Sequence, residues 1–380
     1  MGALDGILVV DLSRAVAGPH AGMMLGDLGA RVIKVESPGG DDSRHWGPPF
    51  VDGESTYFLS VNRNKESVVL DLKSDDGREA LDALIERADV LIENFKVGTL
   101  ARLGFSEERV RALNPRIVIL SITGFGHDGP EAARAGYDQI AQGEAGLMSV
   151  TGSGPGDPQR VGVPISDVLA GLYGAFGIVA ALYDREKSGV GTTVRTSLLA
   201  ATVGAHVYQG TAQTVGHVTA QPRGNHHPSL APYGLFHASD GPIQIAVGTE
   251  GQWASLCAVL GIEQAEKFST NSFRVTRHAE VVELLNSAMS TRTSADVLAE
   301  LEKAGVPAGK IRTLAEVYDW EQTRSQGLVV DVDHATLGNI EIPGPALRWF
   351  DSTGEVTPTR HLAPPTLGQH TNDVLSWLAD

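Results

Sequence analysis

Short apolar segments alternate with helix-like segments through the first third of the chain, and this alternation limits the possible folds. Segments with helical spacing of apolar residues lie at 19–30 and 75–88, the second with Ser74 placed to cap it. Buried strands joined by helices form parallel sheets with right-handed crossovers. The pattern therefore predicts an α/β fold with a Rossmann-like parallel sheet, with strands at 7–12, 31–36, 66–72, 89–93, 116–122 and, further on, 192–196.

A change of composition divides the chain after this region. The segment 214–232 is rich in Gly, Pro and His, which is typical of a linker. The 380 residues also exceed the roughly 250–300 at which a single core stops growing. We expect a large domain over 1–213, a linker over 214–232, an inserted small α+β domain over 233–312, a second linker over 313–330, and a C-terminal segment over 331–380 that returns to the large domain.

The small domain should begin with a β-hairpin over 233–248, whose turn contains Ser239, Asp240 and Gly241. Helices are predicted near 250–261, 278–290 and 294–304. We expect Ser294 to cap the last of these helices and Gly305 to end it.

Composition argues against several kinds of partner. The net charge of −16 disfavours nucleic acid, because neutralising phosphates needs clustered Lys and Arg. No apolar run is expected to reach the ~18 residues of a membrane span. The N-terminal stretch MGALDGILVVDLS has no basic region and leads directly into a predicted strand, which is unlike a secretory signal. We expect a cytoplasmic protein that binds neither nucleic acid nor membrane.

Motifs for metals and common cofactors are not evident in the sequence. There is no Walker A loop, G-x-S-x-G elbow or H-E-x-x-H motif, and TGSGPG at 151–156 does not match G-x-G-x-x-G. His226 and His227 are adjacent, so their side chains project differently and do not form a metal site by themselves. The single cysteine, Cys257, is expected in the core. No metal and no permanently bound cofactor are expected.

The stretch GVPISDVLAG, 162–171, places Asp167 after a proline and before a long apolar run predicted to form a buried helix. A charged side chain there is costly unless it caps, pairs or reacts. Residue preferences alone favour an N-cap role for Asp167, with a reactive role left open. Gly171 and Gly174, on one face of the same helix, are expected to permit close packing.

Stretches along nearly the whole chain together resemble one family. They include VVDLSRAVAGPHAGMMLGDLGARVIKVESPGGDDSR, NRNKESVVLDLKSDDG, ADVLIENFKVGTLARLGF, NPRIVILSITGFGHDGP, GYDQIAQGEAGLMSVTG, GVPISDVLAGLYGAFGIVAAL and RGNHHPSLAPYGLF. In this order they resemble the class III coenzyme A transferases of the CaiB/BaiF type, the group of formyl-CoA transferase and carnitine CoA-transferase. The resemblance implies an interlocked homodimer whose substrates are an acyl-CoA thioester and a free carboxylic acid.

The same resemblance implies that Asp167 is the nucleophile of the transfer. The carboxylate would attack the acyl-CoA, pass through a mixed anhydride to an aspartyl-CoA thioester, and then transfer CoA to the incoming acid. With an ordinary pKa of about 3.9, an aspartate is ionised at neutral pH without further tuning. We therefore expect Asp167 to be ionised and reactive.

Residues that match the family's CoA contacts are expected to bind the CoA part. Ser37 stands where the formyl-CoA enzyme has an arginine, so part of that phosphate contact is either missing or supplied by another group such as Arg44. The stretch HHPSLAPYG lacks that enzyme's glycine run, which argues against formate and oxalate as substrates. The breadth of such members in the family that the chain resembles implies a C4–C5 dicarboxylate exchanging with succinyl-CoA. The expected CoA contacts are Ala15, Val16, Leu70, Lys73, Asn94, Phe95, Arg102 and Tyr137.

Two alternatives stay open. An α-methylacyl-CoA racemase would share the fold and CoA site, but its base would be a histidine where this chain has Tyr137, next to Asp138. A phenol with a pKa of about 10 is a poor base at pH 7. The other alternative, a CoA-binding protein without catalysis, is disfavoured by the presence of Asp167.

Overall fold

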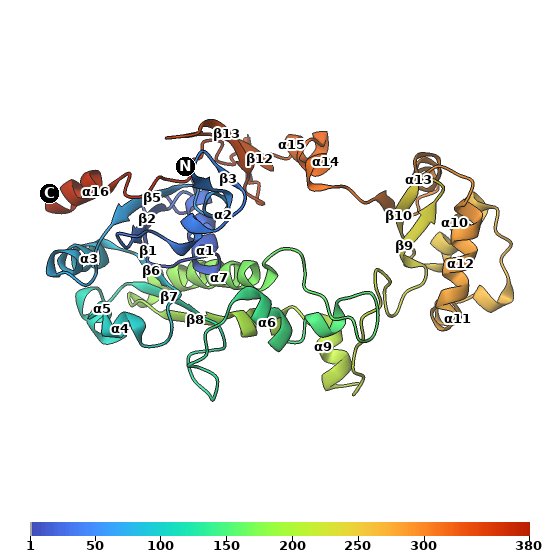
Figure 1. Cartoon of the computed structure of the whole chain (residues 1–380), viewed down its shortest axis with the longest axis horizontal. Helices are drawn as coiled ribbons and strands as arrows, with labels where there is room; N and C mark the ends of the chain where they lie inside the picture. Colours follow the sequence, from blue (N-terminus) through green and yellow to red (C-terminus); the bar gives the residue numbers. More distant parts are fainter. Residues whose placement is uncertain (1) are drawn as a thin grey trace. The chain divides into compact units, whose positions relative to one another are not determined.

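A computed structural model describes residues 2–380, which form two compact units (Figure 1). Unit 1 comprises residues 2–147, Arg160–Val218 and Glu321–Asp380. Unit 2 comprises Met148–Gln159 and Thr219–Trp320. The segment Met148–Gln159, which contains the glycine-rich stretch TGSGPG, thus belongs to unit 2.

Unit 1 is built on a parallel sheet. Among residues 2–380, six strands pair in the order β5-β2-β1-β6-β7-β8, and every neighbouring pair is parallel. The α/β fold with a large parallel sheet, predicted from the alternation, is confirmed. The strands are β1 (Leu8–Asp11), β2 (Arg31–Glu36), β5 (Lys65–Val69), β6 (Val90–Glu93), β7 (Val118–Thr123) and β8 (Thr193–Ser197).

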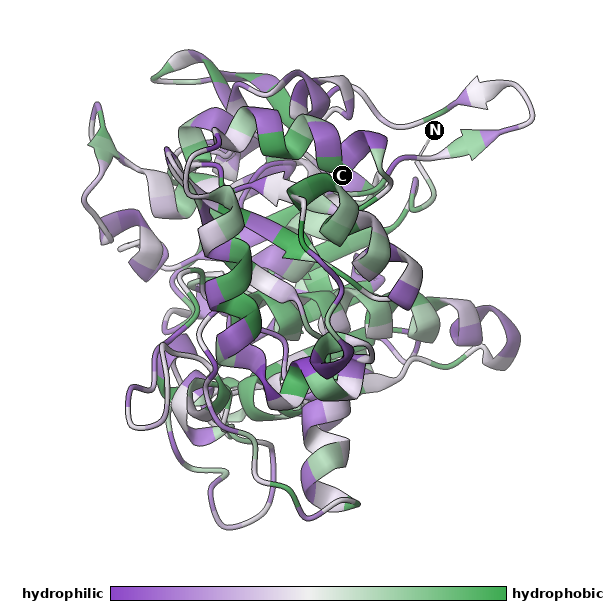
Figure 2. Ribbon diagram, turned by 90° about the vertical axis from the view of Figure 1, so that its right-hand side faces the viewer, coloured by the Kyte–Doolittle hydropathy of each residue, from purple (hydrophilic) through white to green (hydrophobic). Residues whose placement is uncertain are grey.

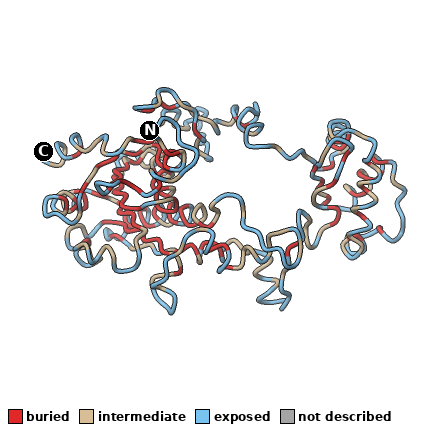
Figure 3. The backbone as a smooth tube through the Cα atoms, in the orientation of Figure 1, coloured by how far each residue is buried: buried red, intermediate tan, exposed pale blue. Residues whose placement is uncertain are grey.

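Helices cover both faces of the sheet, because successive strand residues point to opposite sides. On one face, α1 (Ala17–Asp27) and α7 (Ile165–Ser188) pack with Val9 and Val90. On the other face, α3 (Asp75–Arg87), α5 (Glu107–Leu113) and α16 (Thr371–Ala379) pack with Val10 and Leu91. The buried parts of the tube follow these strands (Figure 3). Helices carry both green and purple segments, as expected where one side of a helix is buried (Figure 2).

Local signals explain how several elements begin and pack. Ser74 caps α3 as predicted, since its Oγ accepts the N–H of Gly77 at 3.1 Å. The close packing expected of α7 is also found. A Cβ at Gly171 would lie 2.7 Å from the carbonyl oxygen of Ala17, and one at Gly174 would lie 2.7 Å from Leu120.

Within the described residues, α7 alone is long and apolar enough to cross a membrane, judged by length and composition only. The expectation that no apolar run reaches the ~18 residues of a membrane span is therefore wrong for this segment. In unit 1 this helix buries Ala170, Ile178 and Leu182 against the strands, which is the packing of a core helix.

The order of the strands places a crevice at one end of the sheet. The chain runs outward from β1 to β2 and β5, then returns to the other side of β1 for β6, β7 and β8. In doubly wound sheets, ligands bind outside the carboxyl ends of the strands where the direction reverses. That point lies between β1 and β6, so the loops after these strands are the first places to look for a site.

Shorter elements complete unit 1. They are η1 (Asp42–His45), β3 (Phe50–Val51), β4 (Glu54–Ser55), α2 (Thr56–Ser60), α4 (Thr99–Arg102), α6 (Asp138–Glu144), α8 (Leu198–Gly204), α9 (Val207–Thr214), α15 (Glu321–Ser325), β12 (Val329–His334), β13 (Gly338–Pro343), β14 (Phe350–Asp351) and β15 (Gly354–Glu355).

Unit 2 has its own core, in which helices pack on a three-stranded antiparallel sheet of order β11-β10-β9. The predicted hairpin is present as β9 (Tyr233–Ala238) and β10 (Gly241–Ala246), but the predicted cap of helix α13 (Ser294–Lys303) is wrong. Thr293 caps this helix by accepting the N–H of Asp296, whereas the hydroxyl of Ser294 donates to Asp240 at 3.0 Å. The elements are η2 (Met148–Val150), β9 (Tyr233–Ala238), β10 (Gly241–Ala246), α10 (Glu250–Leu260), η3 (Glu266–Phe268), α11 (Asn271–Thr276), α12 (His278–Met289), α13 (Ser294–Lys303), β11 (Ala308–Lys310) and α14 (Leu314–Tyr318).

Candidate active site

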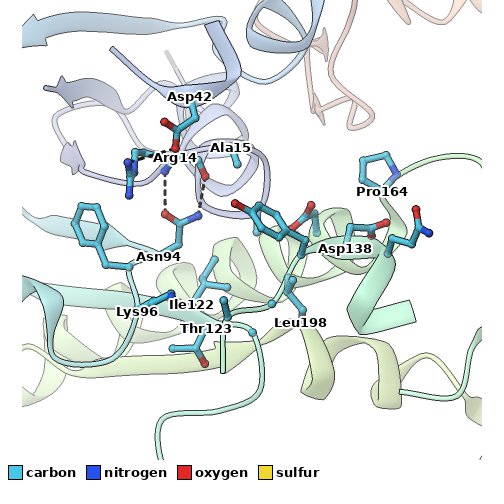
Figure 4. A pocket seen from close by; sticks show the side chains of 18 of the residues that line it. Arg14, Ala15, Asp42, Asn94, Lys96, Ile122, Thr123, Asp138, Pro164 and Leu198 are labelled. Carbon is cyan, nitrogen blue, oxygen red and sulfur yellow. Dashed lines mark hydrogen bonds and ion pairs between the residues drawn. The ribbon is translucent and has the colours of Figure 1, made fainter. Parts of the chain in front are cut away.

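A cavity of about 540 Å³ in unit 1 opens at the carboxyl ends of β1, β6 and β7 (Figure 4). Its wall includes Arg14 after β1, Asn94 after β6 and Thr123 at the end of β7. Asp167, in the first turn of α7, lines the same cavity. Asp167, the carboxylate that the sequence analysis selected, therefore lies in the cavity at the point where the strand order reverses, between β1 and β6.

Asp167 does not cap its helix. The N-cap is Pro164, which has no side-chain hydrogen bond to offer, and Asp167 is the third helical residue. Its side chain is half-buried, and within residues 2–380 it has no hydrogen-bond or ion-pair partner. The N-cap interpretation is therefore wrong, and the carboxylate faces the cavity without a structural partner.

The environment of Asp167 alters its acidity. Burial, and secondarily the negative charge of Asp138, raise the pKa of Asp167 to about 7. The sequence-based expectation of an ordinary pKa is therefore wrong, because desolvation depends on what packs around the carboxylate.

Tyr57, which sequence analysis missed, lines the same cavity. The pKa of its phenol is raised by burial and by the charges of Asp167 and Asp138.

Asp138, the first residue of α6, links this helix to the first turn of α7. Its Oδ1 accepts the backbone N–H of Ser166 at 2.8 Å, and its Oδ2 accepts from Gln142 at 2.7 Å. Oε1 of Gln142 in turn accepts the N–H of Val161 at 2.8 Å. These hydrogen bonds fix the start of α7, and with it the position of Asp167.

The loop after β1 forms another wall of the cavity. Asn94 accepts the N–H of Arg14 at 2.9 Å and donates to its carbonyl oxygen at 2.7 Å, which joins the loops after β1 and β6 (Figure 4). Ala15 has a φ of 66°, in the left-handed region, and its N–H donates to Oδ1 of Asp41 at 3.1 Å. Val16, also predicted to bind CoA, is the buried N-cap of α1 and does not line the cavity.

A buried ion pair holds this loop in place. Nζ of Lys34 lies 2.8 Å from Oδ2 of Asp41, both side chains are fully buried, and Lys34 also donates to the carbonyl oxygen of Ser13 at 2.8 Å. Burial alone would raise the pKa of Asp41, but the Lys34 ammonium and two backbone N–H groups outweigh it and lower the pKa to about 2. Asp41 therefore stays ionised while it supports the loop.

A second cavity, of about 240 Å³, lies beside the first and is lined by Leu70, Lys73 and Phe95. Phe95 lines both cavities, so its ring lies where they adjoin. Arg102 is exposed and lines neither cavity, but its guanidinium donates to Oγ1 of Thr99, a residue of the second cavity, at 2.7 Å. Six of the eight predicted CoA residues thus line one of the two cavities, whereas Val16 and Arg102 line neither. Ala15, Asn94, Phe95 and Tyr137 line the first cavity, and Leu70, Lys73 and again Phe95 line the second.

Arg44 does not replace the arginine missing at Ser37. Its guanidinium forms two 2.7 Å hydrogen bonds to Glu36 and lies 3.6 Å from the centroid of the Phe58 ring. With that pairing Arg44 is nearly buried and unavailable to a phosphate. Ser37 lines the second cavity.

The remaining candidates fall outside the site. Among residues 2–380 there is no group of three His, Cys, Asp or Glu side chains able to hold a metal ion. Cys257 is buried in the core of unit 2, and burial raises the pKa of its thiol to about 11. A buried thiol with a raised pKa is unreactive, so Cys257 serves only in packing.

Comparison with known proteins gives a consistent result. The model of CoA-transferase family III matches residues 4–371. A mouse protein named succinyl-CoA:glutarate CoA-transferase is 40% identical, with 99% of this chain and 86% of that protein aligned. A succinate–glutarate CoA-transferase of Agrobacterium fabrum is 41% identical, with 99% and 95% aligned. The crystal structure of a CaiB/BaiF family protein from Brucella suis superimposes with a TM-score of 0.88 at 39% identity, covering 99% of each chain.

Proposed function

The chain belongs to CoA-transferase family III and is an enzyme of the CoA-transferase class; on this premise we propose that it moves CoA from an acyl-CoA thioester to a free C4 or C5 dicarboxylic acid. The observation that carries the proposal is the carboxylate of Asp167, which faces the first cavity with no partner in residues 2–380. A thioester bound there would meet this group directly.

The reaction uses Asp167 as a covalent carrier. One carboxylate oxygen attacks the acyl carbonyl, and the C–S bond breaks to give a mixed anhydride and the CoA thiolate. The thiolate then attacks the aspartyl carbonyl, and the first acid leaves as a carboxylate, so that an aspartyl-CoA thioester remains. The incoming acid repeats the two steps in reverse and regenerates Asp167. No proton is consumed, and the thioester bond energy is conserved.

The position of Asp167 suits this role. The first turn of α7 carries the positive end of the helix dipole, which favours a carboxylate or a developing oxyanion beside it. Burial opposes ionisation and removes water from the carboxylate, which makes the ionised fraction more nucleophilic. A pKa of about 7 leaves near half of the molecules ionised at neutral pH.

CoA binding is assigned to the two adjoining cavities. Phe95 lies where they meet, so the pantetheine chain is placed to pass its ring on the way from the second cavity to Asp167. Lys73 is exposed beside the second cavity and is positioned to meet a phosphate. The substrate class is supported by the names of the relatives, which are a succinyl-CoA:glutarate and a succinate–glutarate CoA-transferase.

The racemase alternative is not favoured by the comparisons. A racemase of this kind would need a histidine at the position of Tyr137. Tyr137 lines the cavity and is 67% exposed. Solvent deuterium provides a direct check, since racemisation exchanges the α-proton of a 2-methylacyl-CoA and transfer does not.

We also propose that the working form is a homodimer, as the family resemblance implies. One side of α7 is buried in the core, while the opposite side exposes Leu172, Phe176, Val179 and Tyr183. Contiguous exposed apolar side chains on a long helix commonly mark a protein interface. A second copy of the chain would cover this face.

The function is tested by mixing the enzyme with pairs of acyl-CoA and acid and following all CoA esters by mass spectrometry. Succinyl-CoA with glutarate should give glutaryl-CoA and succinate in equal amounts, with little free CoA. Failure to transfer CoA to any C4 or C5 dicarboxylate, with the protein folded, contradicts the proposed substrate class.

A further inference from the structure

Four cationic residues line the first cavity: Arg14, Lys96, Arg134 and Arg160. A dicarboxylic acid has one carboxylate to react and another that keeps its charge. That second charge enters a cavity that already contains Asp138 and Asp167. Like charges at close range raise the energy of the complex, so the second carboxylate needs a cation of its own.

Two of the four cations already have acidic partners. Arg14 lies 3.3 Å from Asp42. Arg134 pairs with Glu131 at 2.9 Å and with Glu144 at 2.7 Å. Within residues 2–380, Lys96 and Arg160 have no acidic partner, so these two are available to a bound anion.

Their places in the cavity differ. Lys96 directly follows Phe95, and it also lines a neighbouring cavity of about 330 Å³. In the close-up it lies on the opposite side of the site from Asp138 and Pro164 (Figure 4). Lys96 therefore belongs to the CoA side of the cavity and not to the side of the nucleophile.

Arg160 begins the segment that leads to the nucleophile. Gly162, Pro164 and Asp167 follow it, and all of them line the cavity. Nη1 of Arg160 donates to the carbonyl oxygens of Val161 at 3.1 Å and Gly162 at 3.2 Å. The guanidinium is thus held along this segment, while its Nε and Nη2 have no protein partner among the described residues.

We propose that Arg160 binds the distal carboxylate of the dicarboxylic acid and so sets the enzyme's preference for diacids over monoacids. The inference rests on the proposed function and adds a specificity-determining residue to it. A guanidinium presents two parallel N–H donors that match a carboxylate, and Nε and Nη2 are the pair left free here.

The test compares glutarate with pentanoate, which has the same chain length but lacks the second carboxylate. Succinyl-CoA is the donor for both acids, so that any change in donor binding is common to the two rates. In Arg160→Gln, the ratio of kcat/KM for glutarate to that for pentanoate should fall about 10- to 100-fold, because a charge-assisted hydrogen bond is lost. Arg160→Lys keeps the charge and should recover part of the ratio.

Arg134→Gln is the matched control, since it removes a cation of the same cavity that already has acidic partners. Its ratio should stay within about twofold of the parent's. An unchanged ratio in Arg160→Gln, with a parent that prefers glutarate, overturns this inference and leaves the proposed function standing. A parent that transfers CoA to none of the C4 and C5 dicarboxylic acids overturns both.

Discussion

The backbone N–H of Ser166 donates a 2.8 Å hydrogen bond to Oδ1 of Asp138, so one carboxylate anchors the residue next to Asp167 and also adds to the raised pKa of Asp167. Asp138 therefore affects Asp167 in two ways, through a hydrogen bond and through its charge. The hydrogen bond fixes the start of α7, and the charge acts through space. Variants that separate geometry from charge are accordingly informative at this site.

Asp167→Asn should abolish CoA transfer, with a loss of about 10⁴-fold or more in kcat, because an amide cannot form the anhydride. Parent enzyme incubated with acyl-CoA and then hydroxylamine should carry a hydroxamate on Asp167, detected by peptide mass spectrometry. Transfer at the parent rate by Asp167→Asn would remove Asp167 from the mechanism.

The pH profile should report the raised pKa of Asp167. Attack needs the ionised carboxylate, so kcat/KM should fall as pH drops through about 7. Asp138→Asn removes the smaller cause of the raised pKa and leaves burial in place, so the midpoint should move to lower pH but stay above the ordinary value for an aspartate. A midpoint near pH 4 in the parent would contradict the structure's account of Asp167.

The same group should make folding stability depend on pH. Below about pH 4 the carboxyl is protonated in both the folded and the unfolded chain, so the shift has no effect. Between about pH 4 and 7 the unfolded chain ionises first, and folding becomes progressively less favourable. Asp167→Asn lacks this titration and should be more stable than the parent by about 1–3 kcal/mol at pH 8, after discounting for partial exposure.

Urea unfolding at pH 8 and pH 4.5 measures this difference. The gain in the free energy of unfolding should be largest at pH 8 and should shrink at pH 4.5. Asp184→Asn, at an exposed position of the same helix, is the control and should change stability by no more than about 0.5 kcal/mol at either pH.

Arg102→Ala should raise the KM for CoA thioesters by about tenfold or more, corresponding to the loss of about 1.5–3 kcal/mol from a charge-assisted phosphate contact. The guanidinium is exposed and already oriented by Thr99. Repeating the measurement with dephospho-CoA thioesters identifies the phosphate involved. Unchanged CoA affinity would mean that α4 does not meet the nucleotide end.

The exposed face of α7 should control assembly. The parent should elute at about twice 40.1 kDa and resist dilution. Phe176→Asp places a charge at the most exposed apolar side chain of this face, 72% exposed, and should weaken the dimer. A parent that is monomeric and active at low concentration contradicts the dimer, and circular dichroism confirms that the variant is folded.

The strands and helices of unit 1 follow from local sequence. Each predicted strand of the parallel sheet is present, and Ser74 caps α3, because apolar periodicity and capping preferences act between near neighbours in the chain. The position of Asp167 at the start of a long helix also follows from the proline and the apolar run around it. The family resemblance added the proposal that Asp167 is the nucleophile, whereas residue preferences alone assigned Asp167 to a cap.

Tertiary structure decided what these residues can do. The pairing of Arg14 with Asn94, 80 positions apart, exists only because β1 and β6 are neighbours in the sheet. The raised pKa of Asp167 depends on burial and on Asp138, and Arg44 is unavailable because Glu36 binds it. The interactions between charges, the desolvation of a carboxylate and the choice of ion-pair partner all depend on distances in space. These distances are set only when the sheet and its helices pack together, so the order of residues in the chain does not reveal them.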